Sequence, residues 1–399
     1  SSQIERADKA VKQLSNDARA AADSTKQLTQ NSQQNVMYQY DKTMQVNDLR
    51  MQVQYFFGLQ NMIRLFQRGV KDAVATVKEL DAAMTQTAVV TNYSVSDMWE
   101  KLPEYTKNAN TLSTTIADMY NATTLYYQQG LNDQQAMGTA VETLKMARIA
   151  AIDGAEATDL MTAALRGFRL ESNEVNASHV NDVYSILAAR TASDTYEIGT
   201  AVSKTASLAS SANMDLESTA TFLAQIIETT REAPETAGTA LKTIIARFGE
   251  VKKLIDEGKS IGSDEEGEVI DVNKVDAALK TAGISLQEFI KGNEGLDKVF
   301  LRLAERWDTL SVSQQRYIAT QAAGARQQSR FIAMLQDYGR TQQLLDYAYN
   351  AEGAGDEQFA KTKQSLEAKI NELKNSYHTF IMGIANSSAI KTVIDAMST

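Results

Sequence analysis

Two stretches of the chain carry the same pattern of apolar and polar positions. Residues 157–168 read ATDLMTAALRGF, and residues 237–248 read AGTALKTIIARF. Apolar residues recur in both at i, i+3, i+4, i+7, i+8 and i+11, a spacing that places them on one face of an α-helix. In the second stretch this face comprises Ala237, Ala240, Leu241, Ile244, Ile245 and Phe248. We predict that it packs against another helix, which the small residues Gly238 and Ala240 allow to approach closely.

The segments ahead of these two stretches are also alike. Residues 130–144 read GLNDQQAMGTAVETL, and residues 213–227 read NMDLESTATFLAQII. Both place a helix-capping residue just before an amphipathic helix. We interpret this region as two related helix-pair units of about 80 residues each, which bury their faces against one another. The alternative is that Ala-rich amphipathic helices resemble each other by chance.

The N-terminal region has a seven-residue period instead. The a and d positions are apolar from Ile4 to Leu28 except for Thr25, polar from Ser32 to Lys42, and mostly apolar again from Val46 to Met84. A sustained heptad repeat is typical of helices that supercoil with partners. We predict parallel self-association through Val46, Leu49, Val53, Phe56, Ile63, Val70, Val74 and Val77. The alternative is a helix that folds back on its own chain, and the pattern leaves open whether the arm is one continuous helix.

Helix-start signals punctuate the chain after this arm. Capping boxes, in which a side chain accepts from a backbone N–H and an acid or amide three residues on reaches back, are expected at several positions. They pair Asp97 with Glu100, Asn132 with Gln135, Asp153 with Glu156, Asp194 with Glu197, Ser285 with Glu288, and Ser311 with Gln314. Pro234 suits the first turn of the helix that holds the second stripe. The spacing predicts helices joined by short links, as in a bundle or a solenoid.

One acidic segment interrupts the helical pattern. Residues 256–276 read DEGKSIGSDEEGEVIDVNKVD, in which EVIDV alternates as a strand does. A calcium loop that begins at Asp264 fails, because Val269 stands where the turn needs a glycine. We favour a solvated acidic loop, with a small hairpin as the alternative.

The fold class that we predict is all-α: a long N-terminal coiled-coil helix, then a helical bundle or repeat region, with at most one small β-hairpin near 258–272. The changes of pattern divide the chain into five parts. They are a coiled-coil arm over 1–95, a helical core over 96–255, the acidic loop or hairpin over 256–276, a helical subdomain over 277–350, and a linker with a C-terminal helix over 351–399. The chain starts at Ser1 and stops inside a helical pattern, so we expect a piece of a longer protein.

Composition supports long helices and narrows the chemistry. The chain has 20 Gly, 2 Pro and no Cys, which removes disulfides, thiolate metal sites and cysteine nucleophiles. Its net charge of -10 argues against general binding to a nucleic-acid backbone, which needs clustered cations, and we expect no specific binding to nucleic acid. No apolar run is long enough for a membrane span.

Candidate catalytic and metal-binding residues are sparse. His179 and His378 lie far apart in the sequence, and neither has a metal-ligand spacing. No phosphate-binding, dinucleotide-binding or nucleophile-elbow motif occurs. We therefore predict no catalytic residue, no metal and no cofactor, and we expect the protein not to be an enzyme.

Arginines cluster in one segment, RYIATQAAGARQQSRFIAML. Arg316, Arg326 and Arg330 flank the small residues 322–325. One interpretation is a patch that binds an anionic partner. The other, which we favour, is a tight helix crossing that includes Gly324, with the arginines paired to neighbouring acids.

Five segments, taken in order, resemble the core of phage tail tape measure proteins of the type found in long-tailed phages of Gram-positive hosts. They are ELDAAMTQTAVV, ALRGFRL, APETAGTALKTIIARFGEV, VNKVDAALKTAGISLQEF and AAGARQQSRFIAMLQD. The resemblance covers roughly residues 60–345. Residues 1–57 are similar only in character, as a polar coiled-coil arm.

The resemblance implies a structural role in a virion tail. Such a protein sits in the tail-tube lumen or the tail tip, scaffolds tail assembly in the host cytoplasm, sets tail length and leaves ahead of the DNA. It also implies a parallel homo-oligomer, with a trimer or hexamer favoured over a dimer. The other expected partners are tail-tube proteins, tail-tip or distal tail proteins, and tail assembly chaperones. The alternative function is a secreted or surface helical adaptor, or a toxin-delivery module, without enzymatic activity.

Overall fold

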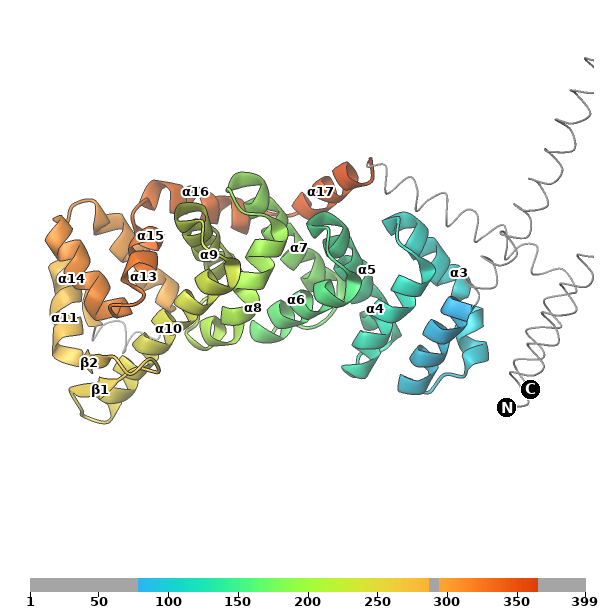
Figure 1. Ribbon diagram of the computed structural model, residues 1–399, viewed down its shortest axis with the longest axis horizontal. Coiled ribbons are helices and arrows are strands. Elements are labelled where there is room, and N and C mark those ends of the chain that lie inside the picture. The colour runs from blue at the N-terminus through green and yellow to red at the C-terminus, as the bar shows by residue number, and fades with distance from the viewer. Residues whose placement is uncertain (1–77, 287–293, 365–399) are drawn as a thin grey trace, which may run out of the picture. The chain divides into compact units, whose positions relative to one another are not determined.

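A computed structural model describes residues 78–286 and 294–364 of the 399-residue chain. The described residues are mostly helical, with one small two-stranded sheet, which confirms the all-α prediction (Figure 1). The predicted coiled-coil arm lies mostly outside them: residues 78–90 are helical, and α3 (Val95–Leu112) follows. Residues 104–371 group into one compact unit, which contains α4 and every later described element. Within this unit, residues 287–293 and 365–371 lie outside the described residues.

The unit begins with a succession of antiparallel helix pairs. Three pairs follow the first helix: α5 with α6, α7 with α8, and α9 with α10. Their bounds are α4 Ile116–Gln128, α5 Asp133–Ala150, α6 Gly154–Gly167, α7 Glu174–Arg190, α8 Thr195–Ser211, α9 Leu216–Thr230 and α10 Pro234–Asp256. Helices α5, α7 and α9 contact one another in turn and form one layer, while α6, α8 and α10 form the other (Figure 1).

The two apolar stripes therefore lie on α6 and α10, with α8 between them. The first helices of the three pairs are capped by Asn132, Asn173 and Asp215. These caps are about 40 residues apart, a period typical of stacked helical repeats. In α8 the stretch IGTAV occupies the place that AGTAL has in α10. The two predicted stripes are therefore separated in the sequence by two repeats of about 40 residues each.

Most predicted helix starts are found where the sequence places them. Complete capping boxes form at Asn132, Asp194 and Ser311. The box predicted at Asp97 is wrong. Ser94 is the capping residue, because its hydroxyl accepts from the Asp97 N–H while the Asp97 carboxylate accepts from the Ser94 N–H. The box predicted at Ser285 extends beyond the described residues.

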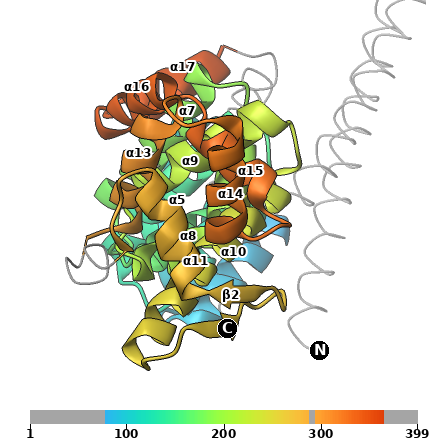
Figure 2. The same ribbon diagram turned by 90° about the vertical axis from the view of Figure 1, so that its left-hand side faces the viewer.

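The acidic segment forms a short antiparallel hairpin, the only sheet among the described residues. Its strands are β1 (Ile261–Ser263) and β2 (Val269–Asp271), with Gly262 opposite Ile270. The remaining described helices are α11 Val272–Thr281, α13 Leu296–Trp307, α14 Val312–Ala323, α15 Gln328–Leu335, α16 Tyr338–Tyr349 and α17 Ala354–Thr362. Figure 2 shows the hairpin beside α10 and α11, and Figure 1 shows it at the end of the unit opposite α4.

Aromatic rings join the end of the stack to the helices that follow it. Phe300 of α13 makes edge-to-face contacts with Phe222 of α9, Phe248 of α10 and Phe331 of α15, at centroid distances of 5.6 to 5.8 Å. Such pairs stabilise beyond the area they bury. Trp307 contacts Phe331 in the same way and is 1% exposed. The second stripe thus ends, at Phe248, in this aromatic cluster, against the central ring of Phe300.

Candidate functional site

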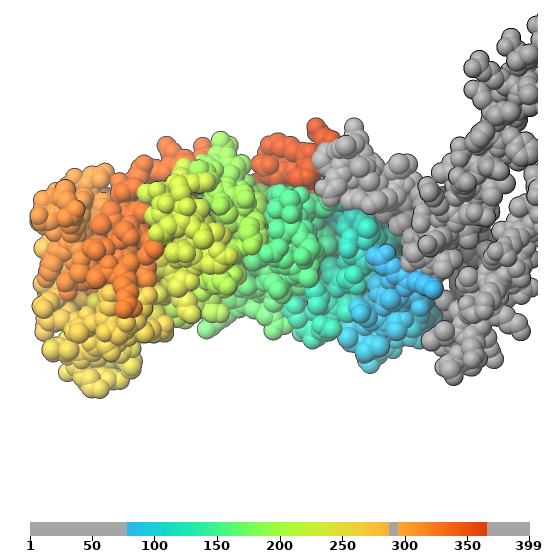
Figure 3. Space-filling model, viewed as in Figure 1, coloured from blue at the N-terminus to red at the C-terminus, as the bar shows by residue number. Residues whose placement is uncertain are grey.

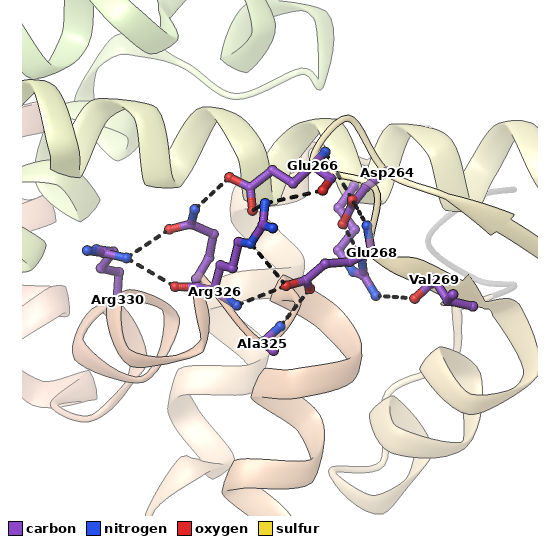
Figure 4. A network of polar contacts seen from close by, with 9 residues as sticks. Asp264, Glu266, Glu268, Val269, Ala325, Arg326 and Arg330 are labelled. Atoms are coloured by element: carbon purple, nitrogen blue, oxygen red, sulfur yellow. Dashed lines mark hydrogen bonds and ion pairs between the residues drawn. The ribbon is translucent and has the colours of Figure 1, made fainter.

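A network of buried and half-buried polar side chains joins the hairpin to α10 and to the turn between α14 and α15. We call it the hairpin latch, and it comprises Arg247, Asp264, Glu266, Glu268 and the backbone of residues 324–326. Figure 4 shows the Glu268 carboxylate directed at Ala325 and Arg326, with Asp264 and Glu266 close by. The latch connects three segments that are far apart in the sequence.

Arg247 is the centre of the latch. Its side chain is 3% exposed, and that of its ion-pair partner Asp264 is 4% exposed. The guanidinium also donates to the carbonyl oxygen of Gln321 on α14 at 3.2 Å and to that of Val269 on β2 at 3.1 Å. A buried charge is stable only when paired and hydrogen-bonded, and the hairpin and α14 together satisfy this one.

Asp264 also shapes the tip of the hairpin. Its second carboxylate oxygen accepts the backbone N–H groups of Glu266 at 3.1 Å and Glu268 at 2.8 Å. An aspartate that binds the backbone in this way stabilises a tight turn. The interpretation of the segment as a solvated loop is therefore wrong for Asp264: the hairpin alternative is the observed structure, and this carboxylate is buried against Arg247.

Glu268 holds the hairpin to the turn after α14. Its carboxylate accepts the N–H of Ala325 at 2.7 Å and that of Arg326 at 3.3 Å. Gly324 makes this possible: its φ of 82° turns the backbone so that both N–H groups face the carboxylate, and a Cβ there would overlap Glu268. Gly324, predicted within a helix crossing, lies at the C-terminal end of α14.

Two of the three clustered arginines pair with acids, as the favoured interpretation expects. Arg330 forms a bidentate pair with Glu232, at 2.7 and 2.9 Å. Arg326 lies 3.9 Å from carboxylate oxygens of Glu266 and Glu268 and donates to the Glu266 carbonyl. Arg316 is exposed on α14.

The packing residues predicted on α10 lie in the interface with α8 and the core. All six apolar members of the stripe are at most 2% exposed. A Cβ on Gly238 would overlap the carbonyl oxygen of Ala201 and lie 3.0 Å from its Cα, so the two backbones meet at this point. Thr205 of α8 donates to the Gly238 carbonyl at 2.8 Å. Only glycine fits such a crossing without moving a helix.

A second polar cluster holds α17 against α5 and α7. Lys145 donates to Glu142 at 2.6 Å and to Asp356 at 2.7 Å. Asp182 accepts the N–H groups of Gly353 at 3.1 Å and Gly355 at 2.8 Å. Helix α17 therefore begins inside the stretch whose glycines predict a linker, because Asp182 binds the backbone at its start.

Two ionisable groups near this cluster have shifted pKa values. Burial raises the pKa of Glu142, against the opposing effect of Lys145. The hydrogen bond from His179 to Glu217, 2.8 Å long, raises the pKa of His179. His179 thus pairs with a carboxylate on the neighbouring helix α9, and His378 lies outside the described residues.

Neither polar cluster has a clear signal in the sequence. Arg247 lies beside the apolar stripe of α10. No neighbouring residue indicates that it pairs with Asp264, which is seventeen positions later in the sequence. An arginine beside an apolar stripe, next to a segment with excess carboxylates, is the one available signal. The eight predicted self-association residues, Val46 to Val77, all lie outside the described residues.

The described residues contain no group of three or more His, Asp or Glu side chains placed to hold a metal ion. No helix among them is long and apolar enough to cross a membrane. The latch is a set of ion pairs and backbone hydrogen bonds, and its geometry fixes one segment against another.

Comparison with known proteins places the chain in a family. A curated tape measure protein of Pneumococcus phage Dp-1 is 28% identical over 163 residues, which are 40% of this chain and 14% of that protein. No solved structure matches significantly. The family model described as phage-related minor tail protein matches residues 106–324, from α3 to the glycine of the hairpin latch. That match covers more than half of the chain, which therefore belongs to the family of phage-related minor tail proteins.

Proposed function

We propose that this chain is a segment of a tape measure protein, a structural component that scaffolds tail assembly and sets tail length. The observation that carries the proposal is the similarity to the Dp-1 tape measure protein. That similarity spans a small share of the relative's length, so the role concerns a longer parent protein. The family match and the all-α fold support the same proposal.

The latch and the glycine crossing suit a scaffold. Close backbone contact at Gly238 and a satisfied buried Arg247 hold the stack and the hairpin in one geometry. Rigid, packed elements transmit position, whereas catalysis needs reactive groups in a cleft. We infer a non-enzymatic role, in the tail lumen or the tail tip, with exit ahead of the DNA. The net charge of -10 disfavours adhesion to that DNA.

Self-association is a further part of the proposal. The predicted heptad positions from Val46 to Val77 would form the contact between parallel copies, with a trimer or hexamer favoured. The proposed partners are tail-tube proteins, tail-tip or distal tail proteins and, in the host cytoplasm, tail assembly chaperones.

The predicted heptads and the described helix pairs each give the length proposal a magnitude. A continuous helix rises ~1.5 Å per residue, so removing six heptads, residues 4–45, would shorten a helical ruler by about 60 Å. Packed helices lie ~10 Å apart, so removing one folded helix pair of the same length, residues 173–214, would shorten a stack by about 10 Å. The second deletion leaves Asp215 to cap the next helix.

The experiment introduces each deletion, and a duplication of the same residues, into the parent phage gene. Tail lengths are then measured on electron micrographs. We expect shorter tails from the deletions and longer tails from the duplications, with the larger change for residues 4–45. The duplications give a readout where a deletion blocks assembly. Tails of unchanged length in all four phages would refute the length-setting role for this segment.

A further inference from the structure

The outer edge of β1 is an open strand edge. In the hairpin, the N–H of Asp264 donates to the Glu268 carbonyl, and that of Val272 donates to the Ser260 carbonyl. In an antiparallel ladder, hydrogen-bonded residue pairs alternate with non-hydrogen-bonded pairs. Ile261 and Ser263 belong to the non-hydrogen-bonded pairs, so their backbone N–H and C=O groups point away from β2. Among the described residues, no other strand pairs with β1. The edge therefore presents a row of N–H and C=O groups to solvent.

The opposite edge of the hairpin is closed. The outward carbonyl of Val269 on β2 accepts from Arg247. Asp271, at the other end of β2, caps α11 through its side chain. A strand can therefore be added beside β1 and not beside β2.

One face of the hairpin carries two exposed apolar side chains, beside Ser263 and Asp271. Ile261 is 65% exposed and Val269 is 69% exposed, and the alternation along the strands puts both on the same face. The other face is buried: Ile270 is fully buried, and Gly262 lies against Leu254 of α10. Figure 3 shows this part of the chain, in yellow, at the surface of the unit.

The hairpin is held in place before any partner binds. Its tip is fixed by the pair of Arg247 with Asp264 and by the two N–H groups that Glu268 accepts. Because this strand is already ordered, the addition of a peptide does not carry the free-energy cost of ordering the strand. Exposed edges with apolar residues are otherwise avoided in soluble proteins, because they invite pairing.

We propose that β1 is a docking edge for an extended, basic segment of a partner protein, which adds as a third strand and covers Ile261 and Val269. The charge of the partner follows from the carboxylates on either side. Asp256 and Glu265 precede and follow β1 in the sequence, are exposed, and form no ion pair with any described residue, whereas Lys259, which is nearer to the strand, is paired with Glu257. A second copy of this chain would bring the same carboxylates to the edge, which disfavours self-pairing. The docking edge does not depend on the tape measure role, since it concerns binding to the isolated chain.

The test measures binding of fluorescent peptides to the whole chain by anisotropy. The probe is the amidated peptide KVKVTVK, and its acidic counterpart is EVEVTVE. We expect the basic peptide to bind and the acidic peptide to bind at least about tenfold more weakly. We also expect the basic peptide to slow amide hydrogen exchange in residues 259–264, which a contact elsewhere on the acidic surface would leave unchanged.

The matched variants are Ser263→Pro and Ser263→Thr. Proline removes the outward N–H of Ser263, which bonds nothing in the hairpin, and its ring blocks an added strand, while threonine keeps the N–H. We expect about a tenfold loss of affinity for Ser263→Pro and none for Ser263→Thr. A basic peptide N-methylated on its pairing edge gives the same test without altering the protein.

Three results would overturn the proposal. The first is no binding of either peptide at millimolar concentration. The second is equal affinity for the N-methylated peptide, or for the Ser263→Pro chain. The third is that the chain forms a dimer and that Ser263→Pro dissociates it, which would assign the edge to a second copy of the chain.

Discussion

Removing Arg247 tests whether the latch stabilises the end of the stack. In the variant Arg247→Met, the Asp264 carboxylate, which is 4% exposed in the parent chain, loses its cation, and the carbonyls of Gln321 and Val269 lose their donor. Breaking a buried ion pair by removing one partner costs about 3–5 kcal/mol, because the remaining charge is buried alone. For a unit of this size a loss of that order lowers the melting temperature by roughly 10 °C.

The assay combines thermal unfolding followed by circular dichroism with hydrogen exchange of residues 261–271. We expect the hairpin to lose protection in Arg247→Met while α6 keeps it. The double variant Arg247→Met with Asp264→Asn removes the buried charge but keeps an oxygen for the tip of the hairpin, so it should recover a large part of the lost stability. Full protection of the hairpin in the single variant, or no recovery in the double variant, would show that the buried ion pair does not hold the hairpin.

Three further predictions concern other contacts. Gly238→Ala should lower the free energy of unfolding in urea by about 1–3 kcal/mol, because the added Cβ overlaps α8. Gly249→Ala, where the added Cβ has nothing within 4 Å, should raise it by about 0.5–1 kcal/mol. Equal effects of the two substitutions would refute the close crossing. Lys145→Met should lower the free energy of unfolding by about 3 kcal/mol, because the buried carboxylate of Glu142 loses its partner. It should also increase hydrogen exchange in residues 351–362, and unchanged exchange there would contradict this prediction. The raised pKa of His179 makes its ion pair stabilising below pH ~6.5 and lost as pH rises through the folded pKa. His179→Gln should therefore cost a few tenths of a kcal/mol at pH ~6 and nothing at pH ~9, and a cost that does not change with pH would exclude the pair.

The helical fold was predictable because it depends on local patterns. The stripe that ends at Phe248 marks a buried face, and the caps at Asn132 and Asp194 mark helix starts, all of which are encoded within a few residues. The stacking period of about 40 residues was harder to see, since α8 carries a less regular stripe than α6 and α10. The glycine in IGTAV on α8, matching that in AGTAL on α10, is the signal for the middle pair, α7 with α8.

The polar contacts were not predictable, because they join segments that only the tertiary fold brings together. Arg247 contacts Asp264 and Val269 of the hairpin and Gln321 of α14. The start of α17 was missed for a similar reason: two glycines indicate a linker locally, but Asp182 binds their N–H groups from α7. Satisfying a buried charge or a backbone donor is a property of the assembled fold.

The main proposal is that this segment contributes length to a phage tail. The most direct test compares tails from the parent phage with tails from phages in which residues 4–45 or residues 173–214 are deleted or duplicated. We predict tails shortened by about 60 Å when the six heptads are removed, and by about 10 Å when the folded helix pair is removed, with matching increases on duplication. Tails of parental length in every case would contradict the proposal.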